Sequence, residues 1–401
     1  ESPPSRGGPV YLFMNELVHR LIEAHRSAFP DAARPRVFSC PGRINLIGEH
    51  VDYNGGHVFP AAIDRAVYLC VSENTSGRFR FHDAGFQASG ELPLLLFGGG
   101  TVVPRVWLYP AGALALLRSD WDRGFDLSYL SIIPAGGGVS SSAAITVVTL
   151  YAMISMLGMT IDTLELARMG QRVEREYAGV ACGIMDQFAV IHGKKDSAML
   201  LDTRDLSFEY LHIDSSRVHF VLVNSGIKHS LRESGYNDRR RECDSALALL
   251  RGAGAEIAHL CDLAPHDFAP LEAGLPPVER RRARHAIAEN ARTLEFLRRM
   301  RSGDFAGAGD LLYASHASLR DDFEVSIDEL DRLVEWAEPI AGVYGSRMMG
   351  GGFGGCTITM VDASLSEEFA RTIGERFRRE YGTPPDILEC TIGDGVREIA
   401  F

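Results

Sequence analysis

The chain contains almost no lysine. Its 401 residues include 38 arginines but only three lysines, Lys194, Lys195 and Lys228, and none of the three lies in a glycine-rich run. A Walker-type phosphate loop ends in Gly-Lys-Ser or Gly-Lys-Thr, because its lysine reaches the β- and γ-phosphates of the nucleotide. The sequence therefore excludes that type of nucleotide site and leaves other phosphate-binding loops open.

A long hydrophobic run is also missing. No apolar stretch approaches the roughly 18 residues that cross a membrane, so no membrane partner is expected. Residues Glu1–Ser5 are polar, and the chain does not begin with methionine. We interpret this start as a trimmed or tagged end without a secretion signal.

Cysteines are few and scattered. The seven cysteines form no C-x-x-C pair, so neither a zinc site nor a disulfide framework is predicted. Reduced, unpaired thiols are typical of the cytoplasm. We therefore expect a cytoplasmic protein.

Basic residues are spread along a chain whose net charge is −12. Nucleic-acid binders gather Lys and Arg on one face, so no nucleic-acid partner is expected. The one dense basic run, residues 279–285, lacks interleaved aromatic residues and is typical of a solvated helix face. A chain of this length with 46% hydrophobic residues can form two packed domains. We expect a monomer or a weak homodimer.

Strand-like and helix-like segments alternate without internal repeats, which indicates an α+β fold. Strands are predicted where β-branched and aliphatic residues gather, at residues 37–40, 67–71, 127–133, 198–201, 218–223, 356–361 and 387–390. Helical periodicity predicts helices at residues 143–157, 162–177, 237–250, 278–300, 305–320, 329–338 and 365–381. The predicted domains are residues 1–200 and 201–401.

The most informative stretch reads PAGGGVSSSAA and runs from Pro134 to Ala144. Its three glycines allow close approach of the backbone to a ligand, and its serines open an apolar helical run whose N-terminus favours an anion. The stretch predicts a phosphate cradle built from backbone N–H groups. We expect Gly137→Val to abolish nucleotide binding, because valine adds a Cβ and restricts φ. A glycine turn with serine caps is the structural alternative.

A second segment, Pro41–Gly56, places Glu49, His50 and Asp52 on one loop before an Asn-Gly turn. Carboxylates and a histidine can hold sugar hydroxyls, since each carboxylate oxygen accepts from an O–H group. A metal site is an alternative, but no second cluster has the spacing of zinc ligands. A turn with solvated charges is the other alternative.

A third segment, Gly350–Cys356, has five glycines in its first six positions and leads into a predicted strand. Such a run is entropically costly, so it marks the close approach of backbone to a ligand or to another backbone segment. A tight chain crossing is the structural alternative.

Together, the three segments resemble the GHMP kinase superfamily and are most similar to galactokinases within it. Residues 42–56 look like the galactokinase signature, residues 136–143 like the superfamily's ATP-phosphate loop and residues 345–356 like its third motif. The resemblance also includes segments particular to galactokinases, at residues 182–188, 236–243 and 315–322. It implies a two-domain GHMP kinase fold, with a mixed-sheet N-terminal domain, an α/β C-terminal domain and the active site in the cleft between them.

The chain departs from the galactokinase pattern at four positions. Val51 stands where Thr is usual, Ala181 where Pro is usual, Met349 where Thr is usual and Gly235 where Glu is common. None of these changes removes a catalytic charge. Val51 and Gly235 are expected to border the sugar site and so to bear on sugar preference.

The resemblance implies that Asp186 and Arg43 are catalytic, with Asp186 facing the anomeric hydroxyl. Phosphoryl transfer requires in-line positioning, neutralisation of phosphate charge and an acceptor for the hydroxyl proton. An arginine close to an aspartate favours the ionised carboxylate, which can act as a base or as an orienting group. Without the resemblance, Asp186 would be interpreted as a helix N-cap. The implied sugar contacts are Arg43, Glu49, His50, Asp52, Gly183, Asp186 and Tyr236.

ATP and Mg²⁺ are the implied cofactors. The resemblance places ATP against Gly136, Gly137, Gly138, Ser140, Ser141 and Ser142, with Trp107 near the adenine. Magnesium takes only one or two oxygen ligands from such a protein, and these would be Ser142 and Glu174. From the residues alone, Trp107 is a core residue and Glu174 a solvated one.

The implied activity is ATP-dependent phosphorylation of the anomeric hydroxyl of α-D-galactose, so galactose and ATP are the expected partners. One alternative is a kinase of another sugar, such as arabinose or N-acetylgalactosamine. Another is a regulator that binds galactose and ATP without catalysis. Such regulators are altered in the serine loop, whereas Ser140–Ala143 is intact here, which favours an enzyme.

Overall fold

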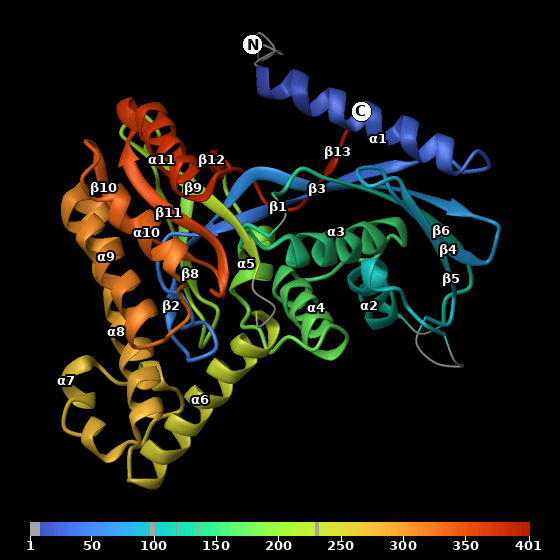
Figure 1. Ribbon diagram of the computed structural model, residues 1–401. Coiled ribbons are helices and arrows are strands. Elements are labelled where there is room, and N and C mark those ends of the chain that lie inside the picture. The colour runs from blue at the N-terminus through green and yellow to red at the C-terminus, as the bar shows by residue number, and fades with distance from the viewer. Residues whose placement is uncertain (1–8, 97–100, 119, 135, 229–231) are drawn as a thin grey trace, which may run out of the picture.

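The structure is a computed structural model that describes residues 9–96, 101–118, 120–134, 136–228 and 232–401. The Glu1–Ser5 segment lies outside the described residues. Two lobes are visible, an N-terminal one built on a large twisted sheet and a C-terminal one of helices around a smaller sheet (Figure 1). Within the described part of the chain, no helix is long and apolar enough to span a membrane.

The N-terminal lobe is built on a six-stranded mixed sheet. Its strands lie in the order β13 (Arg397–Ile399), β1 (Arg36–Asn45), β3 (Pro60–Asn74), β6 (Gly124–Ser131), β4 (Arg78–Asp83) and β5 (Ala88–Pro93). All neighbours are antiparallel except β4 and β6. The pairing of β1 with β3 shifts register between Pro41 and Arg43. Such an irregularity re-aims the side chains that follow it, and Arg43 is the first of them.

Helices cover both faces of this sheet. One face carries α1 (Pro9–Ala28), whose Leu17, Val18, Leu21 and Ile22 pack against β3 and β6 (Figure 1). The other face carries α2 (Leu108–Leu117), α3 (Ser141–Met156), α4 (Thr163–Glu176) and α5 (Met185–His192). Helix α3 contacts β1, β3, α2 and α4, so its apolar sequence is buried on several sides. This packing fixes the N-terminus of α3 next to Arg43.

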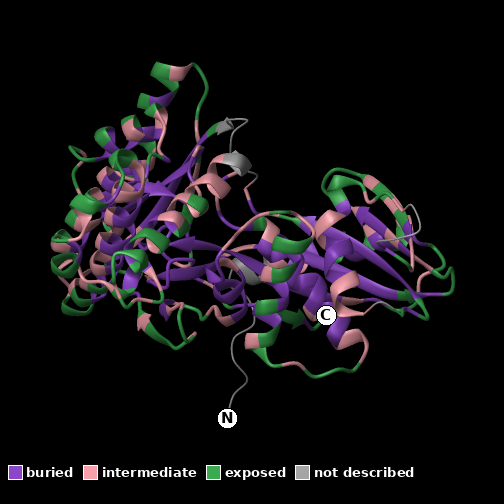
Figure 2. Cartoon of the chain, turned by 90° about the horizontal axis from the view of Figure 1, so that it is seen from below, coloured by how far each residue is buried: buried purple, intermediate pink, exposed green. Residues whose placement is uncertain are grey.

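The C-terminal lobe has an antiparallel sheet in the order β10 (Val343–Met349), β11 (Gly354–Asp362), β9 (Val218–Lys228) and β12 (Asp386–Cys390). Its helices are α6 (Arg232–Gly252), α7 (Pro265–Phe268), α8 (Pro277–Ser302), α9 (Phe305–Asp321), α10 (Asp328–Ala337) and α11 (Ser366–Tyr381). Helix α9 packs closely on β10, and α8 packs on both α9 and α6. Seen from below, the central strands of both lobes are buried and most exposed residues lie on outer helices and loops (Figure 2).

A small third sheet joins the lobes and bears on the expected boundary at residue 200. It contains β2 (His57–Val58), β7 (Ser197–Asp202) and β8 (Phe208–His212). Residue 200 falls inside β7, which pairs with β8 on one side and β2 on the other. In addition, β13 at the end of the chain pairs with β1. A division at residue 200 would therefore separate paired strands, and the last residues of the chain belong to the first sheet.

Each predicted strand and helix overlaps one in the structure. The sequence analysis missed α1, α2, α5, α7, β2, β4, β5, β8, β10 and β13. Most of these are short, and β8 is exposed on almost every residue, so it lacks the alternation that marks a half-buried strand. Helix α1 did carry a signal, since its buried residues recur at positions 17, 18, 21, 22 and 25, with Met14 partly buried on the same face.

Candidate active site

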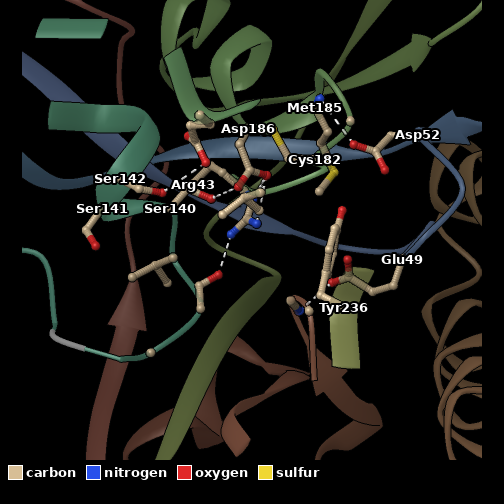
Figure 3. A pocket seen from close by; sticks show the side chains of 18 of the residues that line it. Arg43, Glu49, Asp52, Ser140, Ser141, Ser142, Cys182, Met185, Asp186 and Tyr236 are labelled. Atoms are coloured by element: carbon tan, nitrogen blue, oxygen red, sulfur yellow. Dashed lines mark hydrogen bonds and ion pairs between the residues drawn. The ribbon is translucent and has the colours of Figure 1, made fainter. Parts of the chain in front are cut away.

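A cavity of about 330 Å³ lies where the two lobes meet and contains most of the predicted site residues. The N-terminal lobe contributes residues of β1, the signature loop 46–56, the loop 134–140 and the segment 180–186. The C-terminal lobe contributes Tyr236 from α6 and Gly350 and Gly351 from the glycine-rich turn. Figure 3 shows the labelled side chains of this cavity.

Asp186 is held by two side chains at the inner end of the cavity (Figure 3). Arg43 Nε lies 3.0 Å and Arg43 Nη2 lies 2.8 Å from Asp186 Oδ1. Ser140 Oγ donates to Asp186 Oδ2 at 2.5 Å. Ser140 occupies one of the two lone pairs of Oδ2, so Asp186 can still accept from a substrate hydroxyl through this oxygen. The side chain of Asp186 is 29% exposed, whereas that of Arg43 is 5% exposed.

The phosphate loop is shaped by its backbone. Gly136 and Gly138 have positive φ, at 77° and 67°. Ser140 also lies in the left-handed region, with φ 59°, which is uncommon for a residue with a side chain. This conformation places Ser140 beside Asp186 and lets α3 begin at Ser141. Ser141 is exposed and points away from Asp186 (Figure 3).

Gly137 does not need the left-handed conformation, contrary to the φ argument made from the sequence. Its φ is not positive, and a Cβ at this position would contact Asn224 and Pro134 at 3.7 Å. That distance is an ordinary van der Waals contact. The backbone constraint therefore lies at Gly136 and Gly138. Arg43 holds the loop through two hydrogen bonds. Its backbone N–H donates to Val139 O at 3.1 Å, and its Nη1 donates to Gly138 O.

Ser142 and Glu174 face each other beside the cradle. Ser142 Oγ donates to Glu174 Oε2 at 3.4 Å, and Gln187 Nε2 donates to Glu174 Oε1 at 2.9 Å. Glu174 is buried, contrary to its interpretation as a solvated residue. Desolvation, together with the nearby charge of Asp186, raises the pKa of Glu174 to about 8. A cation would stabilise the ionised form of this carboxylate.

The signature loop presents Glu49, His50 and Asp52 to the cavity, although Glu49 also has a structural role. Glu49 Oε1 accepts from Arg347 Nη1 at 3.2 Å and from the Gly350 N–H at 2.8 Å. His50 Nδ1 lies 2.7 Å from Tyr53 Oη. Asp52 Oδ2 accepts from the Met185 N–H at 3.4 Å. Desolvation and the charge of Asp186 raise the pKa of Asp52 to about 6.

Gly183 and Tyr236 complete the sugar side of the cavity. A Cβ on Gly183 would lie 1.8 Å from Asp52 Oδ2, so only glycine lets Asp52 approach this segment. Tyr236 packs against the rings of His50 and Tyr53. Asn237, the next residue, accepts from the Ala181 N–H at 3.1 Å. The proline that is usual at position 181 could not donate this bond.

The structure does not bring Trp107 to the cavity. Its side chain is 3% exposed and stacks on Phe81, with ring centroids 5.1 Å apart. Trp107 therefore belongs to the core, which was the alternative to an adenine contact. Tyr109, two positions after Trp107, does line the cavity.

The glycine-rich turn combines the two roles considered for it. Gly350 and Gly351 line the cavity, whereas a Cβ on Gly352 would lie 2.4 Å from Val325 O. The turn is thus a tight chain crossing at Gly352 and an open wall of the cavity two residues earlier.

Val51 and Gly235 do not line the cavity, although the sequence predicted that they border the sugar site. Val51 is fully buried against Gly56. A Cβ on Gly235 would lie 2.6 Å from Phe353 Cζ. Val51 and Gly235 therefore pack against other parts of the protein, behind the residues that face the cavity.

The sequence analysis missed a set of buried polar residues in the C-terminal lobe that hold the signature loop. Arg347 Nε donates to Leu46 O at 3.0 Å, and Arg347 Nη2 donates to Asn45 O at 2.5 Å. Glu289 accepts from the Gly48 N–H at 3.1 Å. Two further residues of α8 hold the loop and the strand that follows it, as His285 Nε2 lies 3.1 Å from Glu49 O and Asn290 Oδ1 accepts from the N–H of His57 in β2. Only Arg347 falls in a motif that the sequence singled out.

Comparison with known proteins agrees with this geometry. Residues 23–73 match the galactokinase galactose-binding signature, residues 109–194 the N-terminal domain of GHMP kinases and residues 293–379 their C-terminal domain. A galactokinase of Bacillus subtilis (strain 168) is 39% identical over 378 residues, which cover 93% of this chain and 97% of the relative. The chain belongs to the galactokinase family.

Other members of the family are similarly close. A galactokinase of Exiguobacterium sibiricum is 40% identical over 371 residues and is covered over 93% of its length. The crystal structure of Lactococcus lactis galactokinase complexed with galactose has a TM-score of 0.91 and 33% identity, with 96% of this chain and 100% of that chain covered. Methanococcus jannaschii mevalonate kinase, at 19% identity and a TM-score of 0.62, shares the fold. The predicted two-domain GHMP kinase fold is thus confirmed.

Proposed function

We propose that this member of the galactokinase family transfers the γ-phosphoryl group of ATP to the anomeric hydroxyl of α-D-galactose. Membership of the family, with curated galactokinases similar over nine-tenths of the chain, makes it a sugar kinase. The observation that carries the assignment of roles is the Arg43–Asp186–Ser140 cluster, because it joins the signature strand to the phosphate loop at one point.

Asp186 orients the attacking hydroxyl. It accepts a hydrogen bond from the anomeric O–H and receives the proton as the new P–O bond forms. A loose transition state needs little basicity, so fixed geometry is the larger contribution. Arg43 supplies this geometry on one side of the carboxylate, and Ser140 supplies it on the other. Arg43 also places positive charge beside the transferring phosphoryl group.

The cradle holds the phosphates without lysine. The N-terminus of α3 and the glycine-rich loop offer backbone N–H groups and a helix dipole to an anion. Tyr109 also lines the cavity, and we assign it the contact with the base that the resemblance implied for Trp107.

Ser142 and Glu174 suit a magnesium ion. Both present hard oxygen atoms to the cavity, and magnesium takes few protein ligands when phosphates supply the others. No cluster of three or more His, Cys, Asp or Glu is found among the described residues, so a more heavily coordinated metal is not favoured. When bound, the ion offsets charge on the β- and γ-phosphates.

Galactose is assigned to the pocket formed by Glu49, His50, Asp52, Gly183 and Tyr236. Each of these faces the same cavity as Asp186, which suits a substrate that presents several hydroxyls at once. A kinase of arabinose or N-acetylgalactosamine is not favoured, since the family members similar to this chain are galactokinases. A silent regulator is not favoured either, because Ser140 is intact and bonded to Asp186.

The cytoplasm is the compartment we assign, and all seven cysteines are free thiols in the structure. We also retain a monomer or a weak homodimer as the assembly.

The direct test is an ADP-release assay with galactose, arabinose, N-acetylgalactosamine and glucose as acceptors. We expect galactose to give by far the highest kcat/KM. The Asp186→Asn variant measures the background, and phosphorus NMR of the product identifies the anomeric phosphate. Equal turnover of several sugars would overturn the assignment of galactose.

A further inference from the structure

A second cavity is lined in part by Asp52, Tyr53 and Gly55 of the signature loop. It has a volume of about 520 Å³ and 14 lining residues. Five of the 14 are arginines, namely Arg168, Arg172, Arg175, Arg204 and Arg240. The protein as a whole carries a net charge of −12, so this gathering of cations contrasts with the rest of the molecule.

Three elements supply these arginines. Arg168, Arg172 and Arg175 recur at spacings of four and three residues on α4, so they share one helix face. Arg204 lies in the turn between β7 and β8, and Arg240 lies on α6. The converging side chains therefore belong to segments that are distant in the sequence.

The carboxylates that orient these arginines stand outside the cavity lining. Arg172 pairs with Glu176 at 2.8 Å, Arg240 with Asp244 at 3.2 Å and Arg204 with Asp202 at 2.6 Å. None of the three acidic partners lines the cavity, where the acidic residues are Asp52 and Asp205. A carboxylate engages two of the five N–H donors of a guanidinium. The remaining donors are available to a ligand on the cavity side.

We propose that this cavity binds an oxyanion of the phosphate class, either inorganic phosphate or a phosphate monoester. The planar guanidinium fork matches the spacing of phosphate oxygens and binds them with two parallel hydrogen bonds. Several forks held by outer carboxylates are organised for such a ligand before it arrives. Gln171, Thr203 and His259 add neutral polar groups to the same wall.

The oxyanion site contacts the sugar pocket through three connections. Asp52 lines both cavities. Arg240 lies 5.0 Å from the ring centroid of Tyr53, whose Oη is 2.7 Å from His50 Nδ1. Arg175 donates from Nε and Nη2 to the carbonyl oxygen of Cys182, the residue before Gly183, at 2.9 and 2.5 Å.

These connections give the direction of the coupling. An anion beside Asp52 disfavours the ionised form of that carboxylate, and an anion on Arg175 competes with the Cys182 carbonyl. Both changes weaken the binding of galactose. Bound oxyanion is therefore expected to raise KM for galactose and to leave kcat little changed, since it lies apart from Asp186 and the cradle.

The binding test uses isothermal titration calorimetry at constant ionic strength. Inorganic phosphate and glycerol 3-phosphate are titrated separately into the full chain saturated with MgADP, so that the cradle is filled. We expect one site for at least one of the two probes, and their relative affinities distinguish a free anion from an ester. Addition of saturating galactose should weaken this binding by the same factor by which the anion raises KM, because coupling is reciprocal.

The variant Arg168→Gln/Arg172→Gln tests the location of the site. We expect its affinity for the anion to fall about tenfold or more, as charge-assisted hydrogen bonds are lost, and the rise in KM for galactose to disappear. The matched control is Arg298→Gln/Arg301→Gln, which removes the same charge from exposed positions of α8 paired with Glu295 and Glu209. This control should behave like the wild type.

Two outcomes would overturn the proposal. One is the absence of binding by either probe once MgADP fills the cradle. The other is equal loss of anion binding in the α4 and α8 variants, which would show a general charge effect. Calorimetry does not require turnover, so failure of this site is distinguishable from failure of the galactokinase assignment.

Discussion

The two halves of the active site are built in different ways. The signature loop on the sugar side is held by buried charged and polar side chains of the C-terminal lobe, above all Arg347 and Glu289. The phosphate loop is shaped by backbone conformation at Gly136, Gly138 and Ser140, and few side chains hold it. The difference follows from the ligands. A protein distinguishes one sugar from another by the directions of the hydroxyl groups, which requires side chains in fixed positions. Binding a triphosphate instead requires many N–H donors and close approach of the backbone to the phosphates.

The two halves also differ in what a substitution would disrupt. Arg347 is fully buried and reaches Asn45, Leu46 and Glu49, which lie about 300 positions away in the sequence. Its removal would leave several buried acceptors without a donor. A glycine of the phosphate loop has no side-chain partners to lose, so a substitution there acts through conformation and space.

The largest expected effect is therefore on the sugar side. Arg347→Met should destabilise the protein by about 3–5 kcal/mol, because it leaves Glu49 and the carbonyl groups of Asn45, Leu46 and Met348 without this buried donor. Urea unfolding measures this loss. Arg347→Lys should recover part of it, since an ammonium keeps the charge without the planar fork. Arg332→Met is the control, as Arg332 is half-exposed and pairs with Glu380 on the surface. Similar destabilisation by both methionine variants would contradict the contrast between the halves.

Asp186 lies where the halves meet, so its substitution should affect chemistry rather than either binding step. Asp186→Asn preserves shape but removes the charge and the proton acceptor, and kcat should fall about 100-fold or more. Affinities for galactose and MgADP, measured by calorimetry, should change much less. Asp122→Asn, at an exposed aspartate, serves as the control. Near-normal kcat in the Asp186 variant would show that the assigned role is wrong.

On the phosphate side, conformation rather than a side-chain contact should decide the outcome. Gly138→Val forces a β-branched residue into φ 67°, at a cost of about 1–2 kcal/mol or more. We expect KM for MgATP to rise while KM for galactose changes little. Gly137→Ala is the matched variant, since Gly137 is not left-handed and has room for a Cβ against the protein. Equal effects of the two substitutions would contradict the role of positive φ.

The pH dependence of galactose binding should report on Asp52. The pKa of Asp52 is raised to about 6, and the ionised form is the one that accepts from sugar hydroxyls. As the pH falls below 6, the fraction of ionised Asp52 decreases, so log kcat/KM for galactose should fall with a slope approaching one, or about tenfold at pH 5. Asp52→Asn should give a lower value without this bend. A bend that persists in the variant would assign the titration to another group.

Much of the fold follows from local pattern, and the exceptions have physical causes. Long segments with a clear period, such as α3, α4 and α9, were predicted close to their observed bounds. Helix α2 escaped detection because it is short, apolar on all sides and interrupted by Pro110 and Gly112. Strands β10 and β13 are stabilised by their neighbours in the sheet, which no local pattern reveals.

The candidate site shows the same division. Residues within one motif, such as Glu49 and Asp52, were found because the chemistry and the motif coincide. The resemblance suggested Trp107 as an adenine contact, yet packing against Phe81 places it in the core. Glu289 and His285 could not be found, since they lie on a helix that looks solvated and reach the signature loop only in the folded chain.

The smallest effect is expected when the three lysines of the chain are replaced. If backbone groups hold the phosphates, replacing all three lysines by methionine should change kcat and KM by no more than about twofold. Lys194 and Lys195 do not line the active-site cavity, and Lys194 lies near the ring of Tyr210. Lys228 is the most stringent of the three, because its backbone pairs with Gly354 in the glycine-rich motif. The single Lys228→Met variant therefore accompanies the triple one. A triple variant that folds by circular dichroism and binds galactose, but no longer binds MgATP, would show that a lysine does hold the nucleotide and that the two halves of the site are built alike.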